Sequence, residues 1–159
     1  MAIQVGDSIP DATMKVLGDK GPEDITTTDI FAGKKVVLFA VPGAFTPTCS
    51  EAHLPGYVVN ADQIKGKGVD SIVCVSVNDA FVMKAWSKDK NAEELLMVAD
   101  GNGEFTKAMG LELDGSGFGL GTRSIRYSLI AEDGKITTLN LEQGGALEVS
   151  SAEAILEAL

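Results

Sequence analysis

Cys49 follows a turn whose residue types favour a reactive thiolate. Residues 42–48 read PGAFTPT, in which Thr46 is a good helix N-cap and Pro47 suits the first helical position. A helix that begins there places Cys49 in its first turn, among backbone N–H groups that lack an intrahelical partner. These groups and a nearby cation convert a thiol into the nucleophilic thiolate. A segment so dense in proline, glycine and threonine argues against the alternative of an inert core cysteine.

Thr46 stands where a thiol–disulfide oxidoreductase would carry the first cysteine of a Cys-x-x-Cys motif, so Cys49 cannot form a local disulfide. Attack on the O–O bond of a peroxide needs a thiolate, a hydroxyl to hold the peroxide and positive charge to stabilise the leaving oxyanion. The segment therefore indicates peroxide chemistry. A second possible capping box, formed by Thr48 and Glu51, moves the helix start by two residues but keeps Cys49 in the first turn.

Arg126 and His53 are the side chains that could act with the thiolate. Arg126 interrupts the mostly uncharged run 124–131, where a buried cation is costly without a partner, and a thiolate would be such a partner. The alternative is a strand-end arginine that reaches solvent, and Arg123 is a secondary candidate of opposite parity. His53 lies one helical turn after Cys49, which would support a hydrolytic Cys–His nucleophile or a purely structural role.

The second cysteine, Cys74, lies inside the apolar run 72–77, which predicts a buried strand residue. It could resolve an oxidised Cys49 through a disulfide, which requires Cα atoms within about 7 Å. A buried thiol that takes no part in the reaction is the alternative. With one histidine and no Cys-x2-Cys pair, the chain cannot assemble a closed zinc site from soft ligands.

Two valine-rich apolar runs, residues 34–41 and 70–77, predict strands that are buried on both faces. Residues 46–67 between them are helical in character, with an interruption at Pro55-Gly56 that predicts two helical pieces or one kinked helix. Strand–helix–strand units followed by an antiparallel hairpin predict a single α/β domain over residues 1–159, with thioredoxin-like topology and a mixed central sheet flanked by helices on both faces. The other predicted helices cover residues 79–90 (capped by Asn78 or Asp79), 102–109 (closed by Gly110) and 152–159 (capped by Ser150 or Ser151). The other predicted strands cover residues 95–99, 123–131 and 135–141, and a hairpin turn at 132–134 joins the last two.

Composition and charge exclude several classes of function. The chain has 159 residues, 45% of them hydrophobic, but no apolar run of the roughly 18 residues that a membrane span needs. Its net charge of −10 disfavours nucleic acid and anionic membrane surfaces as partners. Four glycines in residues 114–121 are wrongly spaced for a nucleotide-binding loop and predict a flexible surface loop. Because the N-terminus resembles neither a secretory nor a transit peptide, we expect a cytoplasmic location, although a processed organellar form would look the same.

The run PGAFTPTCS at residues 42–50 resembles the peroxidatic motif of the peroxiredoxins, in the form used by the type II, or class 5, group. The likeness continues through residues 76–86, 99–103 and 123–127. It implies a thiol-specific peroxidase that reduces hydrogen peroxide and alkyl hydroperoxides and needs no bound cofactor. The roles implied are that Pro42 shields the pocket, Thr46 holds the peroxide, Cys49 attacks and becomes a sulfenic acid, and Arg126 stabilises the thiolate and the transition state.

The resemblance also indicates how the sulfenic acid is reduced. Some class 5 members carry a later resolving cysteine, whereas this chain has none after Cys74. It is similar instead to plant and bacterial type II members, which often take electrons from glutathione and glutaredoxin and sometimes from thioredoxin. We therefore expect an external thiol to attack the sulfenic acid, with Cys74 an optional resolver. The family likeness further implies a homodimer. A redox-sensing binding module with the same fold is the non-enzymatic alternative.

Overall fold

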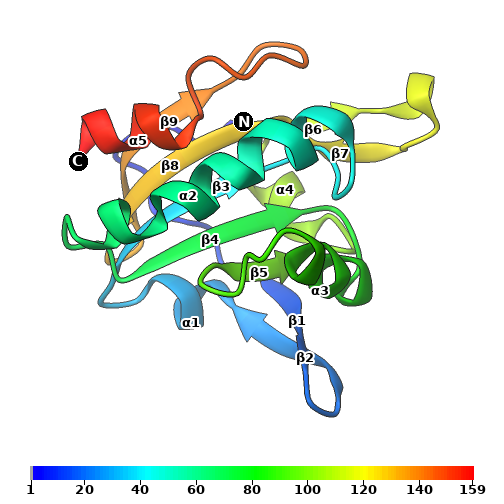
Figure 1. The fold of residues 1–159 in the computed structure, drawn as a ribbon, viewed down its shortest axis with the longest axis horizontal. Helices are drawn as coiled ribbons and strands as arrows, with labels where there is room; N and C mark the ends of the chain where they lie inside the picture. The colour runs from blue at the N-terminus through cyan, green and yellow to red at the C-terminus, as the bar shows by residue number, and fades with distance from the viewer. Residues whose placement is uncertain (1) are drawn as a thin grey trace.

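A mixed seven-stranded sheet lies at the centre of the protein, seen here in a computed structural model that describes residues 2–159 (Figure 1). Its strands are, in spatial order, β2 (Gly21–Thr26), β1 (Thr13–Gly18), β5 (Leu96–Ala99), β4 (Ser71–Ser76), β3 (Lys35–Ala40), β8 (Tyr127–Glu132) and β9 (Lys135–Leu141). The neighbouring strands β5, β4 and β3 are parallel, and all other pairs in the sheet are antiparallel. A separate antiparallel pair is formed by β6 (Glu112–Asp114) and β7 (Thr122–Ser124).

Helices cover both faces of the sheet, as the sequence predicts. Val37 and Phe39 of β3 belong to a core that includes side chains of three helices, α2 (Leu54–Lys65), α3 (Ala80–Asp89) and α5 (Ala152–Ala158). The alternate residues Val36 and Leu38 belong to the opposite core, with side chains of α1 (Thr27–Phe31) and α4 (Glu104–Met109). The side-chain alternation of a strand thus explains why β3, buried on both faces, is apolar throughout.

Several local signals lead to the predicted structure. Asp79 caps α3 by accepting a hydrogen bond from the backbone N–H of Val82, and Ser151 caps α5 in the same way. The β8–β9 hairpin turns at Asp133 and Gly134, both with positive φ (50° and 79°), as a tight hairpin turn requires. Residues 116–119 are exposed in the loop between β6 and β7, which confirms its predicted surface position. No helix within residues 2–159 is long and apolar enough to cross a bilayer.

The strand predicted over residues 123–131 is wrong as one continuous element. β7 ends at Ser124 and pairs with β6 in the small sheet, whereas β8 begins at Tyr127 in the central sheet. The chain changes sheet at Ile125 and Arg126, where the Ile125 N–H donates to the Leu111 carbonyl instead of to a strand of the central sheet. Arg126 therefore sits just before β8, at a strand end.

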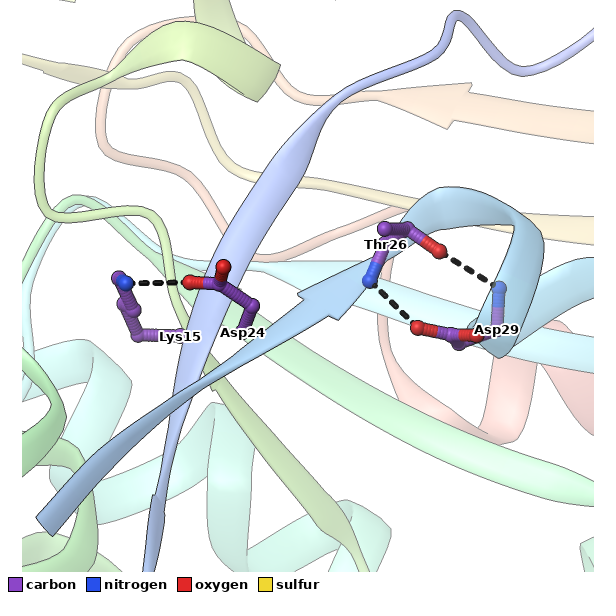
Figure 2. A network of polar contacts seen from close by, with 4 residues as sticks. All are labelled: Lys15, Asp24, Thr26 and Asp29. Atoms are coloured by element: carbon purple, nitrogen blue, oxygen red, sulfur yellow. Dashed lines mark hydrogen bonds and ion pairs between the residues drawn. The ribbon is translucent and has the colours of Figure 1, made fainter.

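The N-terminal hairpin and the helix after it are not anticipated by the sequence pattern. In Figure 2, Lys15 of β1 forms an ion pair across the hairpin with Asp24 of β2, its partner in the strand register. Thr26 and Asp29 form a reciprocal capping box that starts α1, with each side chain accepting from the other residue's backbone N–H. The hydrogen bond from the Thr26 backbone N–H, with a further contribution from the Thr26 side chain, lowers the pKa of the Asp29 carboxyl.

Candidate active site

Cys49 lies at the start of a helix that follows β3, as predicted, but the helix begins irregularly. The backbone is helical from Pro47, and Cys49–His53 forms a π-helical turn in which the Leu54 N–H donates to the Cys49 carbonyl. Thr46 occupies the capping position, yet its hydroxyl donates to the Gly43 carbonyl at 2.6 Å. π-helical turns of this kind occur often at functional sites. The predicted first-turn position of Cys49 is therefore confirmed.

Neither of the two side-chain capping hydrogen bonds expected at this helix start, from Thr46 or from Thr48, is present among residues 2–159. Thr48 forms no capping hydrogen bond, so the proposed Thr48–Glu51 capping box is absent. The prediction of two helical pieces is confirmed, but the change comes just before Pro55: the π-turn Cys49–His53 passes directly into α2, which continues through Pro55 to Lys65. Pro55 is thus in the first turn of the regular helix, a position that suits proline.

Arg126 and Cys49, which lie 77 residues apart, meet on the α2 side of the sheet. The Arg126 Nη2 donates to the Cys49 sulfur at 3.3 Å, and both side chains are almost completely buried. The Arg126 Nη1 donates to His53 Nδ1 at 2.9 Å. One guanidinium therefore bridges the cysteine and the histidine.

No carboxylate lies within 4.0 Å of the Arg126 guanidinium among residues 2–159. Its Nε also has no hydrogen-bond partner in this part of the chain. A buried cation without a counter-ion is costly, and the nearest group that can become an anion is the Cys49 sulfur. The alternative of an arginine that reaches solvent is wrong, because Arg126 is only 3% exposed.

His53 is held as a neutral ring in one tautomer. Arginine can only donate hydrogen bonds, so Nδ1 must accept, and the proton is on Nε2, which donates to the Ser150 carbonyl at 2.9 Å. Burial lowers the pKa of His53 to about 4, the Ser150 carbonyl opposes this shift, and the nearby Arg126 cation adds to it. Since both ring nitrogens are engaged, the imidazole is not free to act as the general base of a Cys–His hydrolase.

The buried neutral His53 gives a testable pH dependence of stability. Between pH 6.5 and about 4 the unfolded chain binds a proton at this residue and the folded chain does not. The neutral His53 therefore contributes fully to the free energy of unfolding above pH 6.5. We expect about 3 kcal/mol of that free energy to be lost as the pH falls from 6.5 to 4. Denaturant unfolding of wild type and His53→Asn over this range measures the effect, because the carboxylates common to both proteins cancel. Equal slopes in the two proteins would contradict it.

The turn over residues 42–46 is fixed from two sides. The Ala44 N–H donates to Asn78 Oδ1 at 3.0 Å, beyond the carboxyl end of β4. Arg123 donates from Nη1 to the Pro42 carbonyl at 3.3 Å and from Nε to the Leu120 carbonyl, so it supports the turn and does not approach Cys49 by a hydrogen bond. These contacts hold Phe45 with a φ of 65°, which is unusual for a bulky residue and typical of functional sites. Pro42 and Thr46, both half-buried, lie in this supported turn.

Trp86 of α3, the single tryptophan of the chain, contacts the helix start directly. Its indole N–H donates to the Ser50 hydroxyl at 2.7 Å, and its ring lies 6.4 Å from that of Phe45. The sequence places Trp86 on a helix face without assigning it to the site. Its contact is with the residue next to Cys49, so its fluorescence can report on the state of this turn.

Cys74 lies on β4, as predicted, and is completely buried in the same hydrophobic core as Cys49. Both thiols are free. Burial raises the pKa of the Cys74 thiol well above its ordinary value, and a thiolate on Cys49 would raise it further. A protonated thiol is a poor nucleophile, which favours the structural alternative for Cys74. Among residues 2–159 no group of three or more His, Cys, Asp or Glu side chains is placed to hold a metal ion.

Comparisons with known proteins agree with this geometry. Residues 4–156 match the Redoxin family model. The chain is 52% identical to peroxiredoxin-2E, chloroplastic, of Arabidopsis thaliana, over 99% of this chain and 70% of that protein. It is 50% identical to peroxiredoxin-2D of the same plant, over 99% and 98% of the two chains. Its structure matches that of reduced Prx3 from Vibrio vulnificus in complex with H2O2, with a TM-score of 0.95, 61% identity and 98% coverage of both chains.

The matching structure confirms the predicted thioredoxin-like fold, and the matches extend over almost the whole chain. The relatives named above are peroxiredoxins of the type 2 group, as the resemblance of residues 42–50 indicates. Cys49 is buried at the start of a helix and accepts a hydrogen bond from Arg126, and the matches cover nearly the whole chain. The chain therefore belongs to the peroxiredoxin family, in its type II or class 5 group, and is a thiol-dependent peroxidase.

Proposed function

We propose that this chain reduces hydrogen peroxide and alkyl hydroperoxides through a sulfenic acid on Cys49. The observation that carries the proposal is the hydrogen bond from Arg126 to the Cys49 sulfur, made by a buried guanidinium with no carboxylate within 4.0 Å among residues 2–159. A related Vibrio vulnificus structure was determined with H2O2 bound, which supports this substrate. A cytoplasmic location and a homodimer stay predictions.

In the first step the Cys49 thiolate attacks the OH oxygen of the hydroperoxide. An S–O bond forms, the O–O bond breaks, and the second oxygen leaves with the bonding electrons as hydroxide or alkoxide, which takes up a proton. The Arg126 guanidinium is suited to stabilise the charge that moves onto the leaving oxygen. Since the Thr46 hydroxyl donates to the Gly43 carbonyl, its lone pairs remain to accept a hydrogen bond from the peroxide. Pro42, in the same turn, would shield this pocket.

In the second stage we propose that an external thiol reduces the sulfenic acid. Attack by glutathione on the sulfur gives a mixed disulfide and releases water, and a thiol of glutaredoxin or thioredoxin then breaks that disulfide to restore Cys49. Two features support an external donor. The chain has no cysteine besides Cys49 and Cys74, and Cys74 is buried with a raised pKa.

Peroxide consumption in a donor-coupled assay tests this proposal. The wild type should turn over with glutathione, glutaredoxin and a reductase, and Cys74→Ser should retain most of this activity because its thiol is buried and protonated. The same two proteins with thioredoxin and its reductase show whether that donor also serves. If Cys74→Ser still consumes the first equivalent of peroxide but fails to turn over, then Cys74 is the resolving residue and the external-thiol proposal is wrong.

A further inference from the structure

In the loop between β9 and α5, residues 142–151, the backbone carbonyl of Ser150 contacts the active site. The Ser150 carbonyl accepts from His53 Nε2 at 2.9 Å and from the Tyr57 hydroxyl at 2.8 Å, although these residues are more than 90 positions away in the sequence. The hydrogen bond that His53 Nε2 donates to this carbonyl fixes the tautomer in which Nδ1 can accept a hydrogen bond from Arg126. The direction of the Ser150 carbonyl therefore determines how Arg126 is held.

One carboxylate oxygen organises this loop. The Oε2 of Glu142 accepts from the backbone N–H groups of Glu148, Val149 and Ser150 at 2.8–2.9 Å, and from the Ser150 hydroxyl at 2.6 Å. The Glu142 side chain is buried, whereas residues 143–145 are exposed and include Gly144 and Gly145. No side chain of residues 143–150 belongs to either hydrophobic core, so hydrogen bonds, including the four to Glu142, define the shape of this loop.

Glu142 also holds the backbone of Arg126. Its N–H donates to the Arg126 carbonyl at 3.0 Å, which continues the β8–β9 pairing by one step. The same residue thus fixes the main chain of Arg126 and, through Ser150 and His53, the partner of its guanidinium. Burial of the carboxyl alone would raise the pKa of Glu142, but the hydrogen bonds from Ser150, Glu148 and Val149 outweigh it and lower the pKa.

We propose that Glu142 is a positioning residue for the peroxidase reaction: by closing the loop on Ser150 it fixes the neutral His53, which holds the Arg126 guanidinium against the Cys49 sulfur. The proposal rests on the proposed function, since Arg126 is taken to act on Cys49 and the peroxide. The Glu142 side chain forms no hydrogen bond with Cys49, so its effect on the reaction is transmitted through His53. Displacing a charged group by about 1 Å is enough to cost on the order of 100-fold in rate.

Glu142→Ala, Glu142→Gln and Ser150→Ala test the proposal, with Glu157→Ala as the matched control. Glu157 is an exposed residue of α5, and its replacement removes the same charge. We expect Glu142→Ala to lower kcat/KM for hydrogen peroxide by about 10- to 100-fold. Glu142→Gln keeps an acceptor oxygen of the same shape and should recover most of the rate. Glu157→Ala should behave as wild type.

A spectroscopic readout separates positioning from general destabilisation. His53 is the single histidine of the chain, so the nitrogen NMR signals of an isotope-labelled imidazole report on it alone. The wild type should show one Nε2-protonated tautomer, and Glu142→Ala a mixture, together with slower alkylation of Cys49 by iodoacetamide at pH 7. Ser150→Ala, which removes one of the four bonds, should show the same change to a smaller degree, and serves if Glu142→Ala does not fold.

The positioning role is overturned if Glu142→Ala shows the same tautomer ratio and alkylation rate as the wild type, whatever the peroxidase result. Where Glu142→Ala does not fold, the same outcome in Ser150→Ala overturns it. Failure of the proposed function has a different signature, because the wild type itself would then consume no peroxide. The tautomer and alkylation measurements do not depend on peroxide turnover, so they decide the role of Glu142 in either case.

Discussion

Cys49→Ser is expected to lower peroxide consumption by at least about 10⁴-fold, because a hydroxyl in place of the attacking sulfur removes the nucleophile of the reaction. The change is nearly isosteric at a site with no exposed surface, so the fold should survive. Peroxide loss is measured with each donor system at fixed protein concentration.

Cys74→Ser is the matched control for this experiment. It makes the same chemical change in the same hydrophobic core, at the only other cysteine of the chain. A wild type and a Cys49→Ser variant that consume peroxide equally would show that Cys49 is not the attacking residue. Loss of activity in both cysteine variants would instead indicate that Cys74 takes part in turnover.

Replacing Arg126 should produce the second largest effect. Arg126→Met keeps a long side chain but removes the hydrogen-bond donor to Cys49. Within residues 2–159 this guanidinium is the only charged group that is hydrogen-bonded to the Cys49 sulfur. Loss of one preorganised donor to developing charge typically costs about 10²–10³ in rate. We expect this decrease in the rate of the first oxidation step, with slower alkylation of Cys49 at pH 7. The single tryptophan, bonded to Ser50, allows the oxidation to be followed by stopped-flow fluorescence.

Arg126→Lys distinguishes charge from geometry in the same experiment. A lysine keeps the positive charge but lacks the planar fork with which Arg126 bonds His53 and Cys49 at once. We expect an intermediate rate, above that of Arg126→Met and below wild type. If Arg126→Met oxidises at the wild-type rate, the guanidinium does not stabilise the reacting charge, and the role assigned to it is wrong.

The sequence predicts best those features that depend on neighbouring residues. The apolar runs of β3 and β4, the caps Asp79 and Ser151 and the Asp133-Gly134 turn all arise from short-range preferences. The first-turn position of Cys49 follows from the same local rules. The family resemblance, and not the pattern alone, singles out Arg126 as its partner.

The features that the sequence does not predict depend on distant contacts. Residues 21–26 (GPEDIT) are polar and become edge strand β2 only by pairing with β1, so no buried pattern indicates them. The contact of His53 with Ser150 spans 97 positions. Without knowledge of this contact, the sequence leaves His53 either as the base of a hydrolase or as a structural residue. Arg126 gives a partial signal as a lone charge in an apolar run, but its place between two sheets depends on the pairing of Ile125 with Leu111 and of Arg126 with Glu142.

The long separation between the groups of the active site has a consequence for biosynthesis. Cys49 precedes Arg126 by 77 positions, and the loop that fixes His53 comes later in the sequence than both. A ribosome makes the chain from its N-terminus, so the cysteine is made well before the groups that surround it. Its thiol then has neither the arginine nor the ordered histidine. We therefore expect the environment of the Cys49 thiol to form only after residues 126–150 have been made, and a chain that stops before the loop has an arginine that its histidine does not hold.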